Sequence, residues 1–193
     1  MKLTIGVMGS SGGDLPEQVR AKGYQVGEAI AEHGAILITG GCPGLPYEAV
    51  RGAKAKGGLV VGISPGLSID EHRARYGSPV EGFDVLIYTG SGLMGREITN
   101  IRSCDMVVIV GGRTGTLGEL AIAYDEGRLI GVLTGTGGIT EIVETIIRAS
   151  GKETGACVLY DDEPKRLIDR LVEYYRTNHF RKPSCFCDAR AEG

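Results

Sequence analysis

Short apolar runs rich in β-branched residues recur along the chain, and most of them end in glycine-rich sequence. The runs are continuous and do not alternate with polar residues, which is typical of parallel strands covered on both faces. We therefore predict strands that begin at Leu3, Ala35, Leu59, Asp84, Asp105, Leu129 and Cys157. Between them, the sequence predicts helices over Pro16–His33, Leu45–Lys56, Gly92–Ser103, Thr114–Gly127 and Gly138–Ser150.

These repeated strand–helix units predict the fold class. Right-handed crossovers between parallel strands give a single-domain, doubly wound (Rossmann-like) α/β fold, with a sheet of about seven strands and helices on both faces. Residues 1–176 form the predicted nucleotide-binding domain, and residues 177–193 form a polar C-terminal tail. Residues 66–83 interrupt the rhythm as a long polar loop. We interpret this loop either as a lid over a site, with His72 as a ligand contact, or as a surface insertion.

The glycine-rich segments after the strands are candidate ligand-binding loops, because ligands of open parallel sheets bind beyond the carboxyl ends of the strands. Small residues let the backbone approach a ligand, and a helix that starts there offers free N–H groups to a phosphate. The candidates are Gly9, Ser10, Ser11, Gly40, Gly41, Gly44, Gly111, Gly112, Arg113, Thr114, Gly115 and Thr116, with Tyr47 and Glu48 as further pocket residues. Together they predict a phosphorylated, nucleotide-like small-molecule ligand.

Other well-known sites fit the sequence poorly. The first loop, GVMGSSGG, spaces its glycines as GxxGxxG, and no acid closes the second strand, so a dinucleotide dehydrogenase is disfavoured. The sequence has no GxxxxGK[ST] motif, and no cysteines, histidines and acids have metal-ligand spacing. Cys185 and Cys187, in the predicted tail, are not expected to bind metal. We expect no cofactor and no metal.

Charge and cysteine content narrow the partners and the compartment. The formal net charge is −3, which disfavours nucleic acid as a partner because phosphate-backbone binding favours a basic face. No apolar run approaches the roughly 20 residues that span a bilayer. The five cysteines, an odd number without a signal peptide, indicate reduced thiols. We therefore expect a cytoplasmic protein that does not bind membranes.

Glu119, in the segment VVIVGGRTGTLGELA, allows two interpretations. Thr116 and Glu119 match a capping box, in which both side chains would satisfy free N–H groups of the helix. Alternatively, Glu119 faces the crevice at the strand ends, opposite a core stripe of Leu117, Leu120, Ala121 and Tyr124. Arg96 lies at the same sheet edge, either in a surface ion pair or in a bidentate contact to phosphate. Its helix is expected to bury Met94, Ile98 and Ile101.

The segment LMGREITNIRSCDMVVIVGGRTGTLGELA resembles the signature of the LOG ("Lonely Guy") family, also labelled possible lysine decarboxylases. The resemblance runs without a gap from Arg96 to Glu119 and extends over about residues 3–175. It implies a phosphoribohydrolase that cleaves a nucleoside 5′-monophosphate to free base and ribose 5-phosphate, and that works as a homodimer or higher oligomer. By matching position, it makes Arg96 and Glu119 the catalytic pair and Gly112, Gly115 and Thr116 the phosphate cradle.

The sequence also departs from the family pattern. Gly111 and Arg113 replace the family's proline and second glycine, and Glu97 replaces the lysine that follows the arginine. The segments GGRTGTLGE and GVLTGTGG look closest to a branch near the molybdenum cofactor carriers. A non-catalytic carrier or sensor of that cofactor, or of another phosphorylated nucleotide-like ligand, is therefore the alternative function. A DNA-binding relative of the same fold would need a basic face, which the net charge does not supply.

Overall fold

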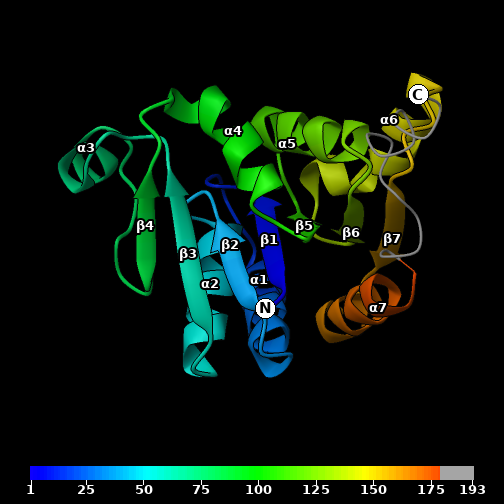
Figure 1. Ribbon diagram of the computed structural model, residues 1–193, viewed down its shortest axis with the longest axis horizontal. Helices are drawn as coiled ribbons and strands as arrows, with labels where there is room; N and C mark the ends of the chain where they lie inside the picture. Colours follow the sequence, from blue (N-terminus) through cyan, green and yellow to red (C-terminus); the bar gives the residue numbers. More distant parts are fainter. Residues whose placement is uncertain (179–193) are drawn as a thin grey trace.

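The computed structural model describes residues 1–178, which form a three-layer α/β fold (Figure 1). The strands are β1 (Thr4–Gly9), β2 (Ile36–Thr39), β3 (Leu59–Ser64), β4 (Val85–Tyr88), β5 (Met106–Val110), β6 (Leu129–Leu133) and β7 (Cys157–Asp161). The helices are α1 (Glu17–Glu32), α2 (Leu45–Ala55), α3 (Ile69–Ala74), α4 (Gly92–Arg102), α5 (Thr114–Asp125), α6 (Val143–Ser150) and α7 (Pro164–Thr177). A short 3₁₀ helix, η1 (Gly138–Glu141), precedes α6. The predicted α/β class and its seven strands are confirmed.

All seven strands form one parallel sheet in the order β4-β3-β2-β1-β5-β6-β7. The chain moves outward from β1 to β4 in one direction, and then returns to the other side of β1 with β5. The order therefore reverses between β1 and β5. In doubly wound sheets, such a reversal opens a crevice at the carboxyl ends of the two strands, and ligands bind there.

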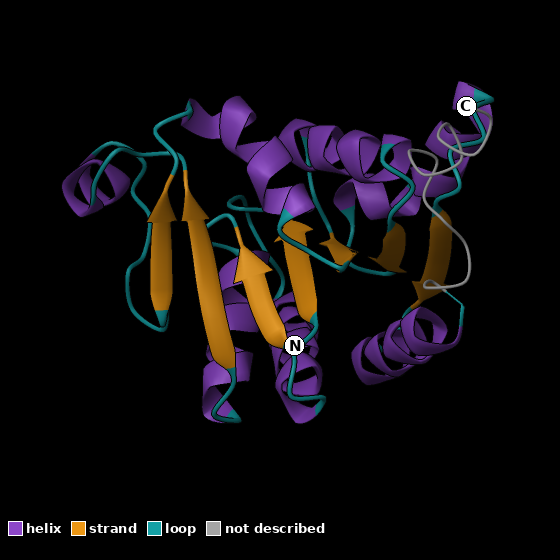
Figure 2. Cartoon of the chain, in the orientation of Figure 1, coloured by secondary structure: helices purple, strands orange, loops and turns teal. Residues whose placement is uncertain are grey.

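Two apolar cores cover the faces of the sheet, as the continuous apolar runs predict. Helices α1, α2 and α7 pack on one face, with Val26, Leu45 and Leu171 among their buried residues. Helices α4, α5 and α6 pack on the other face, with Ile101, Leu120 and Val143 buried. Figure 2 shows the two helical layers on either side of the strands. This arrangement directs the loops after the strands toward α4 and α5.

The structure corrects the prediction for residues 66–83. This segment contains α3, which Ser68 caps by accepting a hydrogen bond from the Glu71 N–H. His72 is fully buried, with one ring nitrogen 2.8 Å from Ser64 Oγ and the other 2.9 Å from the Pro79 carbonyl oxygen. The imidazole therefore packs the segment against the end of β3, and the prediction of an irregular loop is wrong.

Helix α7 is not among the helices predicted from the sequence. It follows β7 and packs on the core with Leu167, Ile168, Leu171, Val172 and Tyr175. It ends at Thr177, one residue past the predicted boundary of the domain. Residues 179–193, including Cys185 and Cys187, lie outside the described residues. Within the described part of the chain, no helix has the length and apolarity that would be required to cross a bilayer.

Candidate functional site

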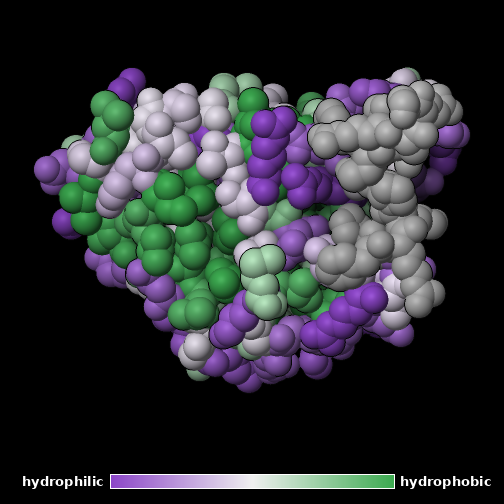
Figure 3. Space-filling model, in the orientation of Figure 1, coloured by the Kyte–Doolittle hydropathy of each residue, from purple (hydrophilic) through white to green (hydrophobic). Residues whose placement is uncertain are grey.

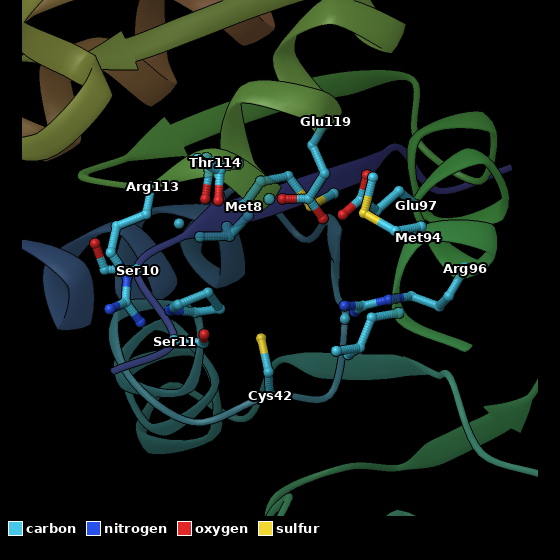
Figure 4. Close-up of a pocket in the computed structure, with 17 residues that line it drawn as sticks. Met8, Ser10, Ser11, Cys42, Met94, Arg96, Glu97, Arg113, Thr114 and Glu119 are labelled. Atoms are coloured by element: carbon cyan, nitrogen blue, oxygen red, sulfur yellow. The ribbon is translucent and has the colours of Figure 1, made fainter. Parts of the chain in front are cut away.

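A cavity of about 420 Å³ opens at the carboxyl ends of β1, β2 and β5, at the place where the strand order reverses. Its size is in the range of small-molecule sites. Its lining comes from the loops after these strands and from the N-terminal halves of α4 and α5 (Figure 4). The lining residues are Val7, Met8, Gly9, Ser10, Ser11, Gly40, Cys42, Pro46, Leu93, Met94, Arg96, Glu97, Arg113, Thr114, Gly115, Thr116 and Glu119.

Most of the residues predicted for the site line this cavity: Gly9, Ser10, Ser11, Gly40, Arg96, Arg113, Thr114, Gly115, Thr116 and Glu119. Gly41, Gly44, Gly111 and Gly112 do not line it. The contacts to a ligand predicted for these four glycines stay predictions. Tyr47 and Glu48 lie outside the lining as well, because Glu48 is held in ion pairs with Arg20 and Arg51.

The four glycines outside the lining shape the loops that carry it. Gly44 has a φ of +81°, and a Cβ there would overlap the Ser10 carbonyl oxygen, so only glycine lets the loops after β1 and β2 touch. The Gly111 N–H donates to Thr136 Oγ1 at 2.9 Å, and the Gly112 N–H donates to Ser10 Oγ at 2.8 Å. These bonds fix the loop after β5 against the loops after β6 and β1, respectively.

Helix α5 points its N-terminus into the cavity. Its N-cap is Arg113, and no side chain caps the first turn. The N–H groups of the first turn therefore remain available, and with the helix dipole they favour an anion. The exposed guanidinium of Arg113 lies over the loop after β1, with Nη2 3.7 Å from the position of a Cβ on Gly12. This end of the cavity has the properties of a phosphate site.

Glu119 is the sixth residue of α5, so the capping box predicted with Thr116 is not formed. The buried residues of α5 are Thr116, Glu119, Leu120 and Ala123. The buried face is therefore shifted by one residue from the predicted core stripe, and Ala121 of that stripe is exposed. Glu119 is thus on the buried face of α5, at the cavity. Its Oε1 accepts a hydrogen bond from Asn100 Nδ2 at 3.3 Å.

The surroundings of Glu119 raise its pKa to about 7, mainly because burial disfavours the charged carboxylate. The Arg96 guanidinium lowers the pKa, the nearby Glu97 carboxyl raises it, and the hydrogen bond from Asn100 lowers it. A carboxyl group that titrates near neutral pH can donate and accept a proton during a reaction.

Arg96 is buried, so the alternative of a surface ion pair is wrong. A Cβ on Gly40 would overlap the guanidinium, which means that glycine at position 40 makes room for Arg96. Nη1 of Arg96 has a long contact of 3.5 Å to the Ile63 carbonyl oxygen, and Nε is buried without a hydrogen-bond partner. Leaving such a group unpaired is costly, so Arg96 is prepared for an acceptor that the described protein does not provide.

Sequence reasoning missed several lining residues, and Glu97 is the most polar of them. It is 5% exposed, and burial raises its pKa while the neighbouring Arg96 lowers it. Helix α4 buries Arg96, Glu97, Asn100 and Ile101, whereas Met94 and Ile98 are exposed. The predicted apolar face of α4 is therefore wrong for Met94 and Ile98. The signal was present in the sequence, because Arg96, Glu97 and Asn100 also lie at helical spacing.

Cys42 follows β2 and contributes its thiol to the cavity (Figure 4). Burial raises the pKa of this thiol, and the Arg96 guanidinium only partly offsets the effect. Cys42 is therefore a neutral thiol at physiological pH, not an activated nucleophile. Among the described residues, no group of three or more histidine, cysteine, aspartate or glutamate side chains could hold a metal ion.

Solved structures similar to this chain share its fold over nearly its whole length. The X-ray structure of TM1055 is 26% identical, covers 90% of this chain and 99% of its own, and has a TM-score of 0.76. The molybdenum cofactor binding protein of Rippkaea orientalis is 29% identical over 92% of this chain and 99% of its own, with a TM-score of 0.75. The molybdenum cofactor carrier protein of Chlamydomonas reinhardtii is 30% identical over 92% and 100%, with a TM-score of 0.73.

The single-stranded DNA-binding DNA processing protein A of Helicobacter pylori is similar at 17% identity, with a TM-score of 0.59 over 89% of this chain and 80% of its own. A likeness at this level shows the fold alone. A closer relative by sequence is an uncharacterized protein of Archaeoglobus fulgidus, 40% identical over 135 residues, or 69% of this chain and 82% of that protein.

The family model that matches is that of the SLOG cluster4 family, and it spans residues 2–168. The match includes every residue that lines the cavity. The LOG resemblance predicted from Arg96 to Glu119 is confirmed, as is its branch near the molybdenum cofactor carriers. This chain belongs to the SLOG cluster4 family.

Proposed function

We propose that the chain is a phosphoribohydrolase that cleaves a nucleoside 5′-monophosphate to free base and ribose 5-phosphate. The observation that carries the proposal is Glu119, a buried carboxyl with a pKa of about 7 that lines the same cavity as an unpaired arginine and an uncapped helix N-terminus. The proposal also rests on the match of Arg96 and Glu119 to the catalytic pair of the LOG family.

The two ends of the cavity have different tasks in this reaction. The first turn of α5 and Arg113 hold the 5′-phosphate, which anchors the ribose. Arg96 lies across the cavity from Arg113 (Figure 4), and in this reaction it binds acceptor oxygens of the ligand. Glu119 lies between these groups, where it reaches the sugar–base bond. Cleavage passes through a cationic, oxocarbenium-like sugar, and a neutral Glu119 carboxyl can protonate the departing base.

Base release tests this proposal. Purified protein is incubated with a panel of nucleoside 5′-monophosphates, and the products are separated chromatographically beside those of Glu119→Gln. We expect free base and ribose 5-phosphate from at least one nucleotide with the unmutated protein only. Bound nucleotide without any free base would contradict hydrolysis.

The second candidate function is a carrier for molybdenum cofactor or for another phosphorylated nucleotide-like ligand. Its support is the similarity to two proteins named for that cofactor, each over 92% of this chain. Arg113 in the phosphate loop and Glu97 beside Arg96, where the hydrolase pattern has other residues, favour it too. This function predicts tight binding without turnover, and mass spectrometry of ligand released from protein purified from the cytoplasm of its own cells distinguishes it.

We further propose that a second copy of the chain covers an apolar area of the surface. Figure 3 shows this area over β3 and β4. Val85 and Ile87 of β4 are 50% and 45% exposed, and Leu93, Met94 and Ile98 of α4 are 56%, 69% and 44% exposed. Such a patch marks an interface. Leu93 and Met94 also line the cavity, so a second copy on this face would close the site from outside.

Sedimentation analysis of the unmutated protein and of Ile98→Glu tests the interface. We expect a dimer or higher oligomer for the first and a monomer for the second, because a charge in an apolar interface is costly to bury. A monomeric unmutated protein at micromolar concentration would contradict the interface. Thr99→Glu is the matched control, because Thr99 is an exposed residue next to Ile98 but has a polar side chain.

A further inference from the structure

Glu97 is a second carboxyl group in the candidate site, and it has no role in the proposed reaction as described above. It follows Arg96 in α4, is 5% exposed, and lines the cavity with Glu119. Figure 4 shows the two carboxyl groups next to each other, with Arg113, Ser10 and Ser11 farther along the cavity. Glu97 is thus on the side of the site away from Arg113 and the loop after β1.

The packing of α4 on α5 makes room for this side chain. A Cβ on Gly118 would lie 2.9 Å from Oε2 of Glu97, which is closer than real Cβ contacts allow. A Cβ on Gly115 would lie 3.6 Å from Oε1, an ordinary contact. The carboxyl group therefore occupies space that only glycine at position 118 leaves free, next to the N-terminal turns of α5.

The described protein does not satisfy the Glu97 carboxyl. Among the described residues, no group is hydrogen-bonded to it, although most buried carboxyl groups have such partners. The side chain is more than nine-tenths buried and faces the cavity, so its missing partner is a group of the ligand or a water molecule.

The two carboxyl groups are close enough to affect each other's ionisation. The titratable or charged side chains that line the cavity are Cys42, Arg96, Glu97, Arg113 and Glu119. Burial raises the pKa of both carboxyl groups, to about 7 for Glu119, where the negative charge of Glu97 adds to the effect, and the Arg96 guanidinium lowers both. Two close carboxyl groups with different environments divide into an acid and a base, and Glu119 is the better placed to keep the proton.

We propose that Glu97 is the general base that activates the attacking water molecule, with Glu119 beside it as the general acid. This inference rests on the proposed function. The bond between C1′ and the base nitrogen breaks, its electron pair goes to that nitrogen, and Glu119 gives the nitrogen its proton. The water oxygen forms the new bond to C1′ and its proton goes to the Glu97 carboxylate. A proton then passes from Glu97 to Glu119, which restores the protonation states of both carboxyl groups. The overall reaction is therefore nucleoside 5′-monophosphate plus water to free base plus ribose 5-phosphate.

The experiment separates the two carboxyl groups by the leaving group. One substrate is a nucleoside 5′-monophosphate, and the other is 4-nitrophenyl ribofuranoside 5-phosphate, whose nitrophenolate leaves without protonation. We expect Glu119→Gln to lose about 10²–10⁴-fold on the nucleotide but less than about tenfold on the nitrophenyl substrate, because only the nucleotide needs the acid. Glu97→Gln should lose about 10²–10⁴-fold on both substrates. Azide should restore much of the nitrophenol release by Glu97→Ala.

The outcomes are distinct. Unmutated protein that cleaves neither substrate would overturn the proposed function, and the role of Glu97 with it. If the unmutated protein cleaves the substrates and Glu97→Gln cleaves the nitrophenyl substrate at the same rate, only the role of Glu97 would be overturned. Glu144→Gln, at an exposed carboxylate paired with Arg148 far from the cavity lining, is the matched control. Thermal unfolding of each variant shows whether a loss of activity comes from a loss of fold.

Discussion

Two buried carboxyl groups, Asp161 and Glu119, are held in opposite ways. Asp161, at the end of β7, accepts hydrogen bonds from Arg166 Nε at 2.8 Å, from Arg170 Nη1 at 2.9 Å and from the Glu163 N–H at 3.0 Å. These partners hold its pKa well below the usual range, with Arg166 the largest cause. Glu119 accepts one hydrogen bond, from Asn100 at 3.3 Å, and burial raises its pKa to about 7.

Under the proposed function, the difference distinguishes a structural carboxylate from one kept for a ligand. The charge of Asp161 is stabilised by its own chain and joins β7 to α7. The charge of Glu119 is poorly stabilised, and its neighbours Arg96 and Asn100 also have buried atoms without partners, Nε and Oδ1. Buried groups without partners are costly for folding, and together with the raised pKa of Glu119 they are typical of functional sites.

The largest expected effect is on turnover. Under the proposed function, Glu119→Gln should lower the rate of base release about 10²–10⁴-fold, because the amide cannot donate an acidic proton. Asp161→Asn should leave the rate within about twofold, since Asp161 does not line the cavity. Steady-state kinetics of both variants measure the contrast, and equal losses would remove the distinction between the two carboxyl groups.

Next in size is the effect of displacing Arg96. Gly40→Ala puts a Cβ into the guanidinium position, so the side chain must move away. A hydrogen bond from a charged donor contributes about 1.5–3 kcal/mol, so its loss should weaken the binding of a nucleoside monophosphate by roughly 10–100-fold. Calorimetry measures the affinity. Gly12→Ala, whose Cβ would meet its nearest atom at an ordinary 3.7 Å, should bind as the unmutated protein does.

Asp161→Asn should instead reduce stability. The free energy of unfolding should fall by about 1–3 kcal/mol, because the arginines lose a charged acceptor, although their own exposure weakens the pairs. Urea unfolding measures the change, with Glu163→Gln as a comparison that alters only the cap of α7. A free energy of unfolding equal to that of the unmutated protein would show that the ion pairs of Asp161 with Arg166 and Arg170 do not stabilise the fold.

The smallest effect is a dependence of stability on pH with opposite sign at the two sites. The pKa of Asp161 is lowered in the folded state, so its stabilisation is present above its ordinary pKa of 3.8 and is lost as the pH falls further. The pKa of Glu119 is raised from 4.5 to about 7, so the folded protein loses stability as the pH rises through this range. Glu119→Gln should therefore gain in melting temperature over the unmutated protein between about pH 5 and 8. A constant difference would contradict the raised pKa.

The sequence predicted the sheet well, because strands buried on both faces of a parallel sheet require continuous apolar runs, and glycine-rich turns mark where these strands end. It predicted α4 less well: Met94 and Ile98 look like core residues, yet α4 buries Arg96, Glu97 and Asn100 instead. The buried face of α5 is likewise shifted by one residue from the predicted stripe. Helix α7 was detectable, since its apolar residues recur at helical spacing after Pro164.

The cavity depends on contacts that no local pattern contains. Gly40 makes room for Arg96, and Gly118 makes room for Glu97, each across a large separation in the chain or between two helices. The role of Gly111 and Gly112 in joining the loop after β5 to the loops after β6 and β1 also depends on Thr136 and Ser10, which are distant in sequence. Spacing could indicate which residues reach the sheet edge, but not which of their polar atoms remain without partners.

Carboxyl NMR is the most direct test of the contrast between Asp161 and Glu119. The carboxyl carbons of glutamate and aspartate are labelled with ¹³C and followed during a pH titration, with Glu119→Gln and Asp161→Asn assigning the two signals. We predict that the Glu119 signal titrates with a midpoint near 7 and that the Asp161 signal stays in its ionised position throughout the range where the protein is folded. A Glu119 midpoint near 4.5 would contradict the account, because the site would then hold an ordinary carboxylate with no proton to give.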